Sequence, residues 1–280
     1  MIKKKVLIVG ASGFLGNYLF KNLKIESSLE LIGSYKDNFK NGLIHFDYNS
    51  DIDFGKIIEI SPDYIIWAAG FKDLKKTELS LSLSLSENYL PIKKLCDKFI
   101  LKIKPKVIYI STDYVFEGSS GNYSVDDKKN PKSYYGKSKL KAEEHLKKVF
   151  TNSHIIRTGG IIAKESNFFN WLIKSLTSEK EIVLYNNFFT PTPIVNIYNA
   201  IRDIIGNKLD DKVIHVNGKE KMRRIDIGQL AARAINSRTR IIERPFDEAS
   251  TKFFKDLSLI SSYNSKKNIN CSDFIYKLLK

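Results

Sequence analysis

Tyr135 and Lys139 combine residue types and a spacing that suit acid catalysis. They lie in "SYYGKSKLKAEEH" (133–145), a segment typical of a helix. Residues four apart share one helical face, so the phenol and the ammonium are expected one turn apart. A cation so placed stabilises a phenolate and lowers the phenol pKa from its usual value of about 10, which suits proton transfer to a ketone that is being reduced.

The Tyr-x-x-x-Lys spacing recurs along the chain and does not by itself select Tyr135. The pairs are Tyr89/Lys93, Tyr135/Lys139, Tyr263/Lys267 and Tyr276/Lys280. A lysine-rich chain forms such pairs by chance, and most of them lie on solvated helix faces. The elements that precede each pair must therefore decide which one can do chemistry.

The composition is that of a folded chain with a substantial core. Its 280 residues are 42% hydrophobic, which suits one large domain or two unequal ones. No apolar run approaches the roughly 20 residues that span a bilayer. The run after the basic start, Val6 to Val9, is also shorter than a signal-peptide core and enters a glycine-rich turn. We expect a cytoplasmic protein with no membrane partner.

Cysteine, histidine and charge argue against several other classes. Cys96 and Cys271 are too few for a disulfide framework, and no Cys/His spacing indicates a metal site. The net charge of +15 invites a nucleic-acid partner, but the basic residues are mostly scattered lysines and the first arginine is Arg157. Surfaces that bind nucleic-acid phosphates or recognise base edges favour arginine. We therefore expect no nucleic-acid partner, and only a minority of the charge to attract an anionic small molecule.

Apolar runs of strand length alternate with helix-like segments in the first half. Strands are predicted at 5–10, 29–35, 43–48, 63–70, 106–116 and 154–162, and helices at 14–24, 55–61, about 87–102 and around Tyr135. Strands without polar alternation are covered on both faces. We predict an α/β fold with a doubly wound, Rossmann-like parallel sheet over 1–162. A smaller, mostly helical substrate-binding portion over 163–280 is interwoven with the last strands. The stretch "LSLSLSLS" (79–86) is interpreted as a loop or irregular helix start.

A glycine-rich turn follows the first strand and opens the first helix. In "GASGFLG" the glycines are Gly10, Gly13 and Gly16. Such a turn lets a pyrophosphate approach the backbone at a helix N-terminus, where unpaired N–H groups and the helix dipole favour anions. The pattern at this position predicts a dinucleotide site. The expected cofactor contacts in the turn are Gly10, Ser12, Gly13, Phe14, Leu15 and Gly16.

The end of the second strand bears on which dinucleotide binds. An acidic residue there favours NAD through the ribose 2′-hydroxyl. The chain instead has Ser34, Tyr35 and Lys36, and a lysine beside a hydroxyl can accept a 2′-phosphate. This favours NADPH, with NADH left open by the nearby Asp37.

The strand at 106–116 separates Tyr135/Lys139 from the other pairs. In a doubly wound sheet, ligands bind beyond the carboxyl ends of the strands. "STDYVF" (111–116) ends this strand, and the helix that holds Tyr135 follows. A hydroxyl from Ser111 or Thr112 can then steady the developing oxyanion beside the nicotinamide, while the phenol supplies the proton.

These motifs resemble the extended short-chain dehydrogenase/reductases, and within them the dTDP-4-dehydrorhamnose reductase branch. The matching stretches are "GASGFLG", "AAG" (68–70), Asn88 in "ENYLPIKKL", "STDYVFEG", "YSVDDKKNPKSYYGKSKLKAEE", "IIRTGG" and "FTPTPIVNIYNAI". The resemblance implies that Thr112, Tyr135 and Lys139 form the catalytic triad, with Lys139 also on the nicotinamide ribose. Its further implied contacts are Asp47, Tyr48, Ala68, Ala69 and Gly70 for the cofactor, and Tyr114, Arg157 and Thr192 for the substrate.

Departures from this pattern concern the sugar side. Asp113 is followed by Tyr114 instead of the glutamate that sugar-nucleotide dehydratases carry, which favours simple ketone reduction. Trp67 and Gly160 replace an asparagine and a substrate-stacking tryptophan of the branch. The resemblance therefore implies NADPH-dependent reduction of a 4-keto sugar nucleotide, for polysaccharide or deoxysugar synthesis. Two alternatives remain: a sugar-nucleotide epimerase, and a non-catalytic cofactor-binding subunit like the partner of methionine adenosyltransferase. A homodimer is left open.

Overall fold

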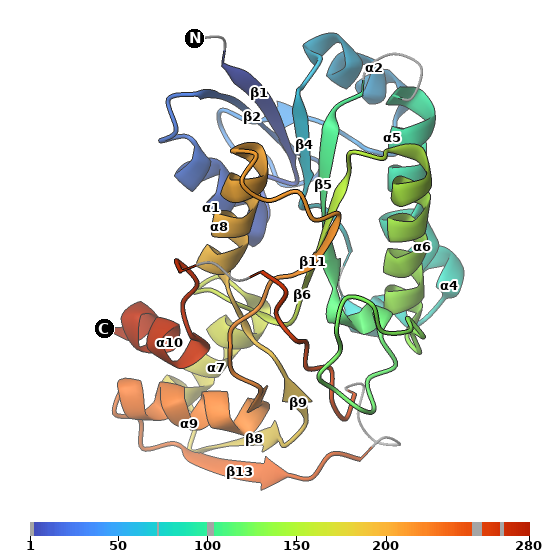
Figure 1. The fold of residues 1–280 in the computed structure, drawn as a ribbon. Helices are drawn as coiled ribbons and strands as arrows, with labels where there is room; N and C mark the ends of the chain where they lie inside the picture. Colours follow the sequence, from blue (N-terminus) through green and yellow to red (C-terminus); the bar gives the residue numbers. More distant parts are fainter. Residues whose placement is uncertain (1–2, 72, 100–103, 248–253, 264–265) are drawn as a thin grey trace. The chain divides into compact units, whose positions relative to one another are not determined.

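A seven-stranded sheet forms the centre of the fold (Figure 1). The computed structural model describes residues 3–71, 73–99, 104–247, 254–263 and 266–280. Within them the strand order is β11-β6-β5-β4-β1-β2-β3, and the pairs from β3 through β5 are parallel. The strands are β1 (Lys4–Val9), β2 (Leu29–Tyr35), β3 (Ile44–His45), β4 (Tyr64–Trp67), β5 (Lys106–Thr112), β6 (His154–Thr158) and β11 (Val213–His215). The order reverses direction between β1 and β4, as in doubly wound sheets, which confirms the predicted fold class.

The chain packs as two compact units, each assembled from several stretches. The first comprises Met1–Val115, Pro131–Ile156 and Ile201–Val213, and the second comprises Phe116–Asn130, Arg157–Ala200 and Ile214–Lys280. The glycine turn and the Tyr135/Lys139 pair both belong to the first unit. The domain division at residue 162 stays a prediction.

Helices cover both faces of the sheet in the first unit. α1 (Phe14–Leu23) lies on one face, and α5 (Leu90–Phe99) and α6 (Tyr134–Val149) lie on the other (Figure 1). Successive side chains of a strand point to opposite faces, and in β1 both sets, Val6 with Ile8 and Leu7 with Val9, are at most 2% exposed. This double burial explains why the strands read as unbroken apolar runs.

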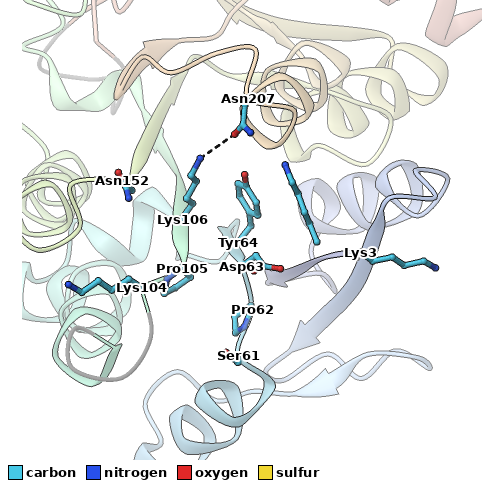
Figure 2. Close-up of a pocket in the computed structure, with 11 residues that line it drawn as sticks. Lys3, Ser61, Pro62, Asp63, Tyr64, Lys104, Pro105, Lys106, Asn152 and Asn207 are labelled. Atoms are coloured by element: carbon cyan, nitrogen blue, oxygen red, sulfur yellow. Dashed lines mark hydrogen bonds between the residues drawn. The ribbon is translucent and has the colours of Figure 1, made fainter. Parts of the chain in front are cut away.

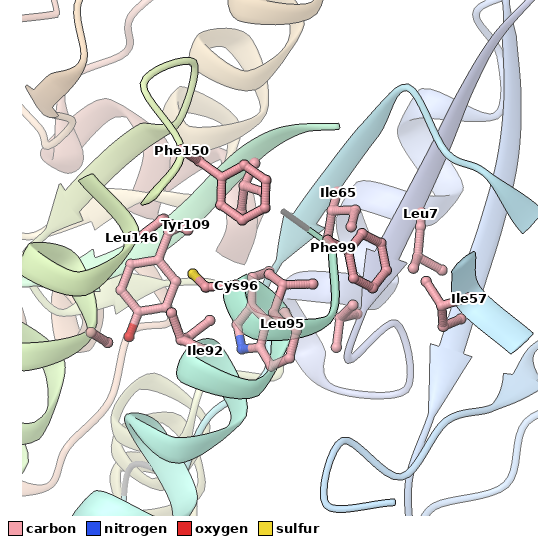
Figure 3. Close-up of a cluster of buried hydrophobic side chains, with 14 of the residues drawn as sticks. Leu7, Ile57, Ile65, Ile92, Leu95, Cys96, Phe99, Tyr109, Leu146 and Phe150 are labelled. Atoms are coloured by element: carbon pink, nitrogen blue, oxygen red, sulfur yellow. The ribbon is translucent and has the colours of Figure 1, made fainter. Parts of the chain in front are cut away.

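A hydrophobic cluster of the first unit lies between the sheet and α5, α6 and α2 (Asp51–Ile60). Figure 3 shows Phe99 and Cys96 of α5 directed toward Ile65 of β4 and Tyr109 of β5. Cys96 is fully buried, and burial raises the pKa of its thiol to about 12. Cys96 is therefore a core residue and not a reactive thiol.

The amino ends of β1, β4 and β5 border a cavity lined by several lysines (Figure 2). Their carboxyl ends lead into the glycine turn, the Ala68–Gly70 loop and the 3-10 turn η1 (Asp113–Val115). The two ends of the same strands therefore carry two separate sets of polar residues.

The predicted elements differ from the observed ones mainly at their ends. The third strand is only Ile44–His45, and the fifth ends at Thr112. The stretch at 79–86, interpreted as a loop or irregular helix start, lies mostly in α4 (Leu81–Asn88), because the Ser80 hydroxyl accepts from the Leu83 N–H and caps a helix. Pro91, in the first turn of α5, separates α4 from α5 within the predicted 87–102 helix. Residues 100–102 of that prediction lie outside the described residues.

The second unit contains helices and short strands. Its elements are β7 (Ile161–Ile162), α7 (Asn167–Ser178), β8 (Glu181–Tyr185), β9 (Phe188–Phe189), β10 (Thr192–Pro193), β12 (Met222–Arg223), α9 (Arg224–Ala234), β13 (Arg240–Arg244) and α10 (Cys271–Leu279), while α8 (Ile194–Ile205) leads back to the first unit. In the first unit a short α3 (Leu74–Thr77) precedes α4. Across the described part of the chain, no helix has the length and apolarity needed to cross a membrane.

Candidate active site

The glycine turn brings the end of β1 against the start of α1 at very close range. A Cβ on Gly16 would lie 2.2 Å from the Gly10 carbonyl oxygen, so helix and strand can touch only without a side chain there. Gly10 has a φ of +84° and a Cβ there would lie 2.9 Å from the Ala69 nitrogen. Both glycines are therefore required by the fold itself.

Gly13 differs from the other two glycines because the chain leaves room beside it. A Cβ on Gly13 would lie 3.4 Å from the Gly10 oxygen, an ordinary contact, and Gly13 is exposed. Gly13 is also the N-cap of α1, where no side chain caps the helix and the first turn has no acidic residue. The uncompensated helix N-terminus fits a phosphate group, and a bare Gly13 lets that group approach the backbone.

The other predicted contacts of the turn reach a ligand in different ways. Ser12 and Phe14 are partly exposed, whereas the Leu15 side chain is only 5% exposed. Leu15 can therefore contact a phosphate through its backbone but not through its side chain.

Charged and aromatic side chains gather at the end of β2. The Lys36 ammonium lies 3.7 Å from a carboxylate oxygen of Asp47 and 4.5 Å from the centre of the Tyr48 ring. Burial raises the pKa of Tyr48 to about 12, helped by nearby carboxylates. The Ser34 hydroxyl is buried and donates to the Ile8 carbonyl oxygen at 3.5 Å. The Ser34 hydroxyl is therefore engaged inside the protein, and Lys36 shares its charge with Asp47.

Tyr35 and Trp67 complete this group of aromatic side chains. The Tyr35 ring meets His45 edge-on with a centroid separation of 5.4 Å. The Tyr48 and Trp67 rings lie 5.9 Å apart. Planar apolar surfaces beside a lysine are suited to an adenine and its ribose.

Asn88 fixes the loop that follows β4. Its side-chain oxygen accepts from the Phe71 N–H at 3.0 Å, and its amide nitrogen donates to the Phe71 carbonyl at 3.1 Å. The loop residues Ala68, Ala69 and Gly70 precede this clamp. Ala69 packs directly against Gly10, so this loop borders the glycine turn.

Thr112, and not Ser111, is the hydroxyl next to Tyr135. Ser111 is buried and donates to the Glu143 carboxylate. The Thr112 hydroxyl donates to an Asp113 carboxylate oxygen at 2.9 Å, and Thr112 is close enough to the Tyr135 phenol to lower the pKa of that phenol. Of the two hydroxyls that the sequence left open, the structure therefore brings Thr112 to the phenol.

The start of α6 is held in place by two side chains and one close backbone contact. A Glu78 carboxylate accepts from the Tyr134 and Tyr135 N–H groups at 3.0 and 3.1 Å. The Ser133 hydroxyl accepts from the Gly136 N–H at 2.9 Å. A Cβ on Gly136 would lie 2.1 Å from the Tyr114 carbonyl oxygen. This contact sets the Tyr114 and Tyr135 rings edge-to-face with centroids 5.7 Å apart.

The Tyr135 phenol is protonated at neutral pH in this environment. Burial raises its pKa well above the usual value, Asp113 adds to the rise, and the Thr112 hydrogen bond opposes it. A neutral phenol is the form that donates a proton to an alkoxide. The arrangement therefore suits ketone reduction, since the reverse oxidation needs the phenolate.

Lys139 is buried and held by groups other than the phenol. Its ammonium donates to the Ile110 carbonyl oxygen at 2.7 Å and lies 4.0 Å from the centre of the Tyr109 ring. Burial lowers the pKa of Lys139 to about 7, and the carboxylate of Glu143 opposes that fall. Within the described residues the ammonium makes no hydrogen bond to Tyr135, so any effect on the phenol acts through space.

Arg157 and Thr192 belong to the second unit and are buried within it. The Arg157 guanidinium lies 5.4 Å from the centre of the Phe116 ring and donates to the Val125 carbonyl at 3.4 Å. The Thr192 hydroxyl donates to the Val216 carbonyl at 3.3 Å. Their contact with substrate stays a prediction. Three residues of this site were not predicted from the sequence to have a role in it. They are Glu78 at the start of α6, Tyr109 beside Lys139, and Glu143, which accepts from Ser111.

The described residues contain no cluster of three or more His, Cys, Asp or Glu side chains suited to a metal ion. The groups that this site offers for chemistry are the Thr112 hydroxyl, the Tyr135 phenol and the Lys139 ammonium, in the unit that holds the glycine turn.

Comparison with known proteins places these features in a family. The sequence model of the family described as RmlD substrate binding domain matches residues 4–254. The dTDP-4-dehydrorhamnose reductase of Aggregatibacter actinomycetemcomitans is 29% identical over 229 residues, covering 77% of this chain and 74% of that protein. Methionine adenosyltransferase 2 subunit beta of Danio rerio is 24% identical over 248 residues, covering 83% and 74%.

Solved structures share the fold. A dTDP-4-dehydrorhamnose reductase from Bacillus anthracis str. Ames, in complex with NADP, superposes with a TM-score of 0.86 at 21% identity, over 99% of this chain and 98% of that one. At that identity the likeness establishes the doubly wound architecture.

Proposed function

We propose that this chain, which belongs to the RmlD substrate binding domain family, is an NADPH-dependent reductase of a 4-keto sugar nucleotide. The observation that carries the proposal is the set Thr112, Tyr135 and Lys139 in the unit that also holds the glycine turn. Relatives named dTDP-4-dehydrorhamnose reductases support the substrate class. The B. anthracis structure with bound NADP supports the cofactor.

The cofactor-binding groups divide between phosphate and adenosine. The α1 N-terminus with Gly13 would take the pyrophosphate. Lys36 would take a 2′-phosphate, with Tyr35, Asp47 and Tyr48 along the adenosine and Ala68, Ala69 and Gly70 lining the loop after β4. When bound, NADPH supplies the hydride.

The protein's own groups manage the proton. As the carbonyl carbon gains a hydride, the carbonyl oxygen becomes an alkoxide and takes the proton of the Tyr135 phenol. The Thr112 hydroxyl, which lies close to that phenol, would orient it and steady the oxyanion. The charged form of Lys139 offsets the phenolate left behind. Solvent then returns the proton to Tyr135, so the net reaction adds one hydride and one proton to the ketone.

A second function is favoured by one comparison. Methionine adenosyltransferase 2 subunit beta proteins are similar to this chain over most of its length, and a cofactor-binding subunit needs the glycine turn but no proton donor. The placement of the Thr112 hydroxyl close to the Tyr135 phenol weighs toward an enzyme.

NADPH oxidation distinguishes these functions. The purified chain is mixed with NADPH and, in separate reactions, with dTDP-4-dehydrorhamnose and other 4-keto sugar nucleotides. Oxidation that depends on the keto sugar, with a hydroxylated product, supports the reductase. Tight NADPH binding without oxidation on any keto sugar would contradict it and support the subunit.

A further inference from the structure

A cavity of about 630 Å³ lies in the first unit at the amino ends of its strands (Figure 2). It is lined by Lys3, Lys4, Ser61, Pro62, Asp63, Tyr64, Lys104, Pro105, Lys106, Asn152 and Asn207. The cofactor groups lie at the carboxyl ends of these strands, so the cavity is not part of the site described above. Its volume is in the range of small-molecule sites.

The lining of the cavity has a strong excess of positive charge. It includes four lysines and a single carboxylate, Asp63. That carboxylate already accepts from the Lys5 N–H at 2.8 Å. Asp210, a carboxylate that interacts electrostatically with Lys106, is paired with Lys212 at 2.8 Å. These carboxylates therefore neutralise little of the positive charge of the lining lysines, and that charge can attract an anion.

Two of the ammonium groups are held by neutral partners. The Lys4 ammonium donates to the Ile205 carbonyl oxygen at 2.6 Å, and the Lys106 ammonium donates to the Asn207 side-chain oxygen at 3.2 Å. Both lie near the buried Tyr64 ring, 5.5 and 5.7 Å from its centre. These contacts fix the ammonium groups without neutralising them, which lowers the ordering cost of binding an anion.

The other two lysines are exposed. In Figure 2 Lys3 and Lys104 extend outward on opposite sides of the cavity, and no ion pair to either is present among the described residues. Their flexible stems allow their charges to close over a ligand that the fixed lysines have bound.

We propose that this cavity binds a small polyanion with two or more phosphate groups, at a site separate from the cofactor site. Two fixed cations and two mobile ones match a diphosphate, whose charge is spread over several oxygens. The concave shape favours a small molecule over an extended nucleic acid. The site does not rest on the proposed function.

Calorimetric titration with inorganic pyrophosphate tests the site. The full chain is first saturated with NADP⁺, so that the glycine turn does not compete, and salt is held near 0.15 M to screen weak surface attraction. We expect one pyrophosphate per chain. The double variant Lys4→Gln/Lys106→Gln should weaken binding at least tenfold.

Lys147→Gln/Lys148→Gln is the matched control, because it removes two exposed lysines at the end of α6 and the same net charge. It should change the affinity less than twofold. Absence of binding to the wild type, or equal weakening in both double variants, would overturn the site and leave only general attraction to a basic surface.

A third variant keeps the test decisive if loss of the Lys4 and Lys106 hydrogen bonds unfolds the chain. Lys3→Gln/Lys104→Gln removes two lining charges and no hydrogen bond of the described structure. Weakening by several-fold supports the site, and an unchanged affinity contradicts it.

Discussion

The ammonium nitrogen of Lys139, which shares helix α6 with Tyr135, lies 4.0 Å from the centre of the Tyr109 ring. Tyr109 is fully buried, and its hydroxyl has no hydrogen-bond partner among the described residues. Figure 3 shows its ring beside Ile92 and Leu146. The face of the Tyr109 ring therefore contacts the Lys139 ammonium. Together with the Ile110 carbonyl oxygen, the ring holds this ammonium in position.

Substitution of Tyr109 should move the pH dependence of the reaction. A desolvated cation–π contact is worth about 2 kcal/mol, or somewhat more than one pKa unit. Tyr109→Leu removes the contact, lowers the pKa of Lys139 and should shift the alkaline limb of kcat/KM about one pH unit lower. Tyr109→Phe keeps the ring face and should leave that limb in place. If the alkaline limb of kcat/KM lies at the same pH in Tyr109→Leu and Tyr109→Phe, the ring has no positioning role.

The buried Lys139 should make stability depend on pH with a definite sign. Its pKa falls from 10.5 in the unfolded chain to about 7 when folded. Between those values the unfolded state binds more protons, so folding becomes more favourable as pH rises. Between about pH 6.5 and 9.5, the free energy of unfolding of the wild type should therefore rise by roughly 3 kcal/mol relative to that of the Lys139→Met variant. Urea unfolding of both proteins measures this gain, and a constant difference would contradict the lysine's depressed pKa.

Two glycines of the turn, Gly16 and Gly13, should respond differently to alanine. Gly16→Ala puts a Cβ 2.2 Å from a backbone oxygen and should cost about 3 kcal/mol of stability or more. Gly13→Ala should cost less than about 1 kcal/mol yet weaken NADPH binding at least tenfold. Gly55, inside α2 with open space around it, is the control, because alanine there should add about 0.5–1 kcal/mol. Thermal unfolding and NADPH titration distinguish the alanine variants at Gly16, Gly13 and Gly55. A Gly13→Ala variant with unchanged NADPH affinity would rule out the proposed phosphate site.

Lys36 and Asp47 should set the preference for NADPH over NADH. Lys36→Gln should weaken NADPH binding about tenfold and leave NADH binding unchanged, because only NADPH carries the 2′-phosphate. Asp47→Asn removes the carboxylate that lies 3.7 Å from the lysine and should strengthen NADPH binding. Fluorescence titrations with both cofactors measure the effect. Parallel losses for NADPH and NADH in Lys36→Gln would exclude a 2′-phosphate contact.

Local patterns predicted the fold well. The buried strands, the glycine turn and the Tyr135 helix depend on residues close together in the sequence. The 79–86 stretch was harder because its Leu/Ser alternation has the period of a strand. Ser84 in this stretch is buried, and its hydroxyl donates to the Ser138 hydroxyl of α6. This tertiary contact overrides the local pattern.

The environment of Thr112, Tyr135 and Lys139 depends on contacts between residues that are distant in the sequence. The sequence left Ser111 and Thr112 both open as the hydroxyl beside the phenol, and the structure separates them, because the Ser111 hydroxyl donates to the buried Glu143 carboxylate. Glu78 caps a helix more than fifty residues later in the chain. The sequence also predicted a cation that lowers the phenol pKa, whereas burial of Tyr135 raises it. Burial is a property of the packed structure and cannot be read from spacing.

Turnover by Tyr135→Phe, compared with Tyr134→Phe, tests the central claim most directly. The two tyrosines are adjacent, and both variants keep the backbone N–H groups that Glu78 accepts. With NADPH and a 4-keto sugar nucleotide, Tyr135→Phe should lose at least about a hundredfold in kcat, while NADPH affinity stays within twofold and Tyr134→Phe keeps wild-type turnover. Full turnover by Tyr135→Phe, or equal losses in the two variants, would contradict the assignment of Tyr135 as proton donor.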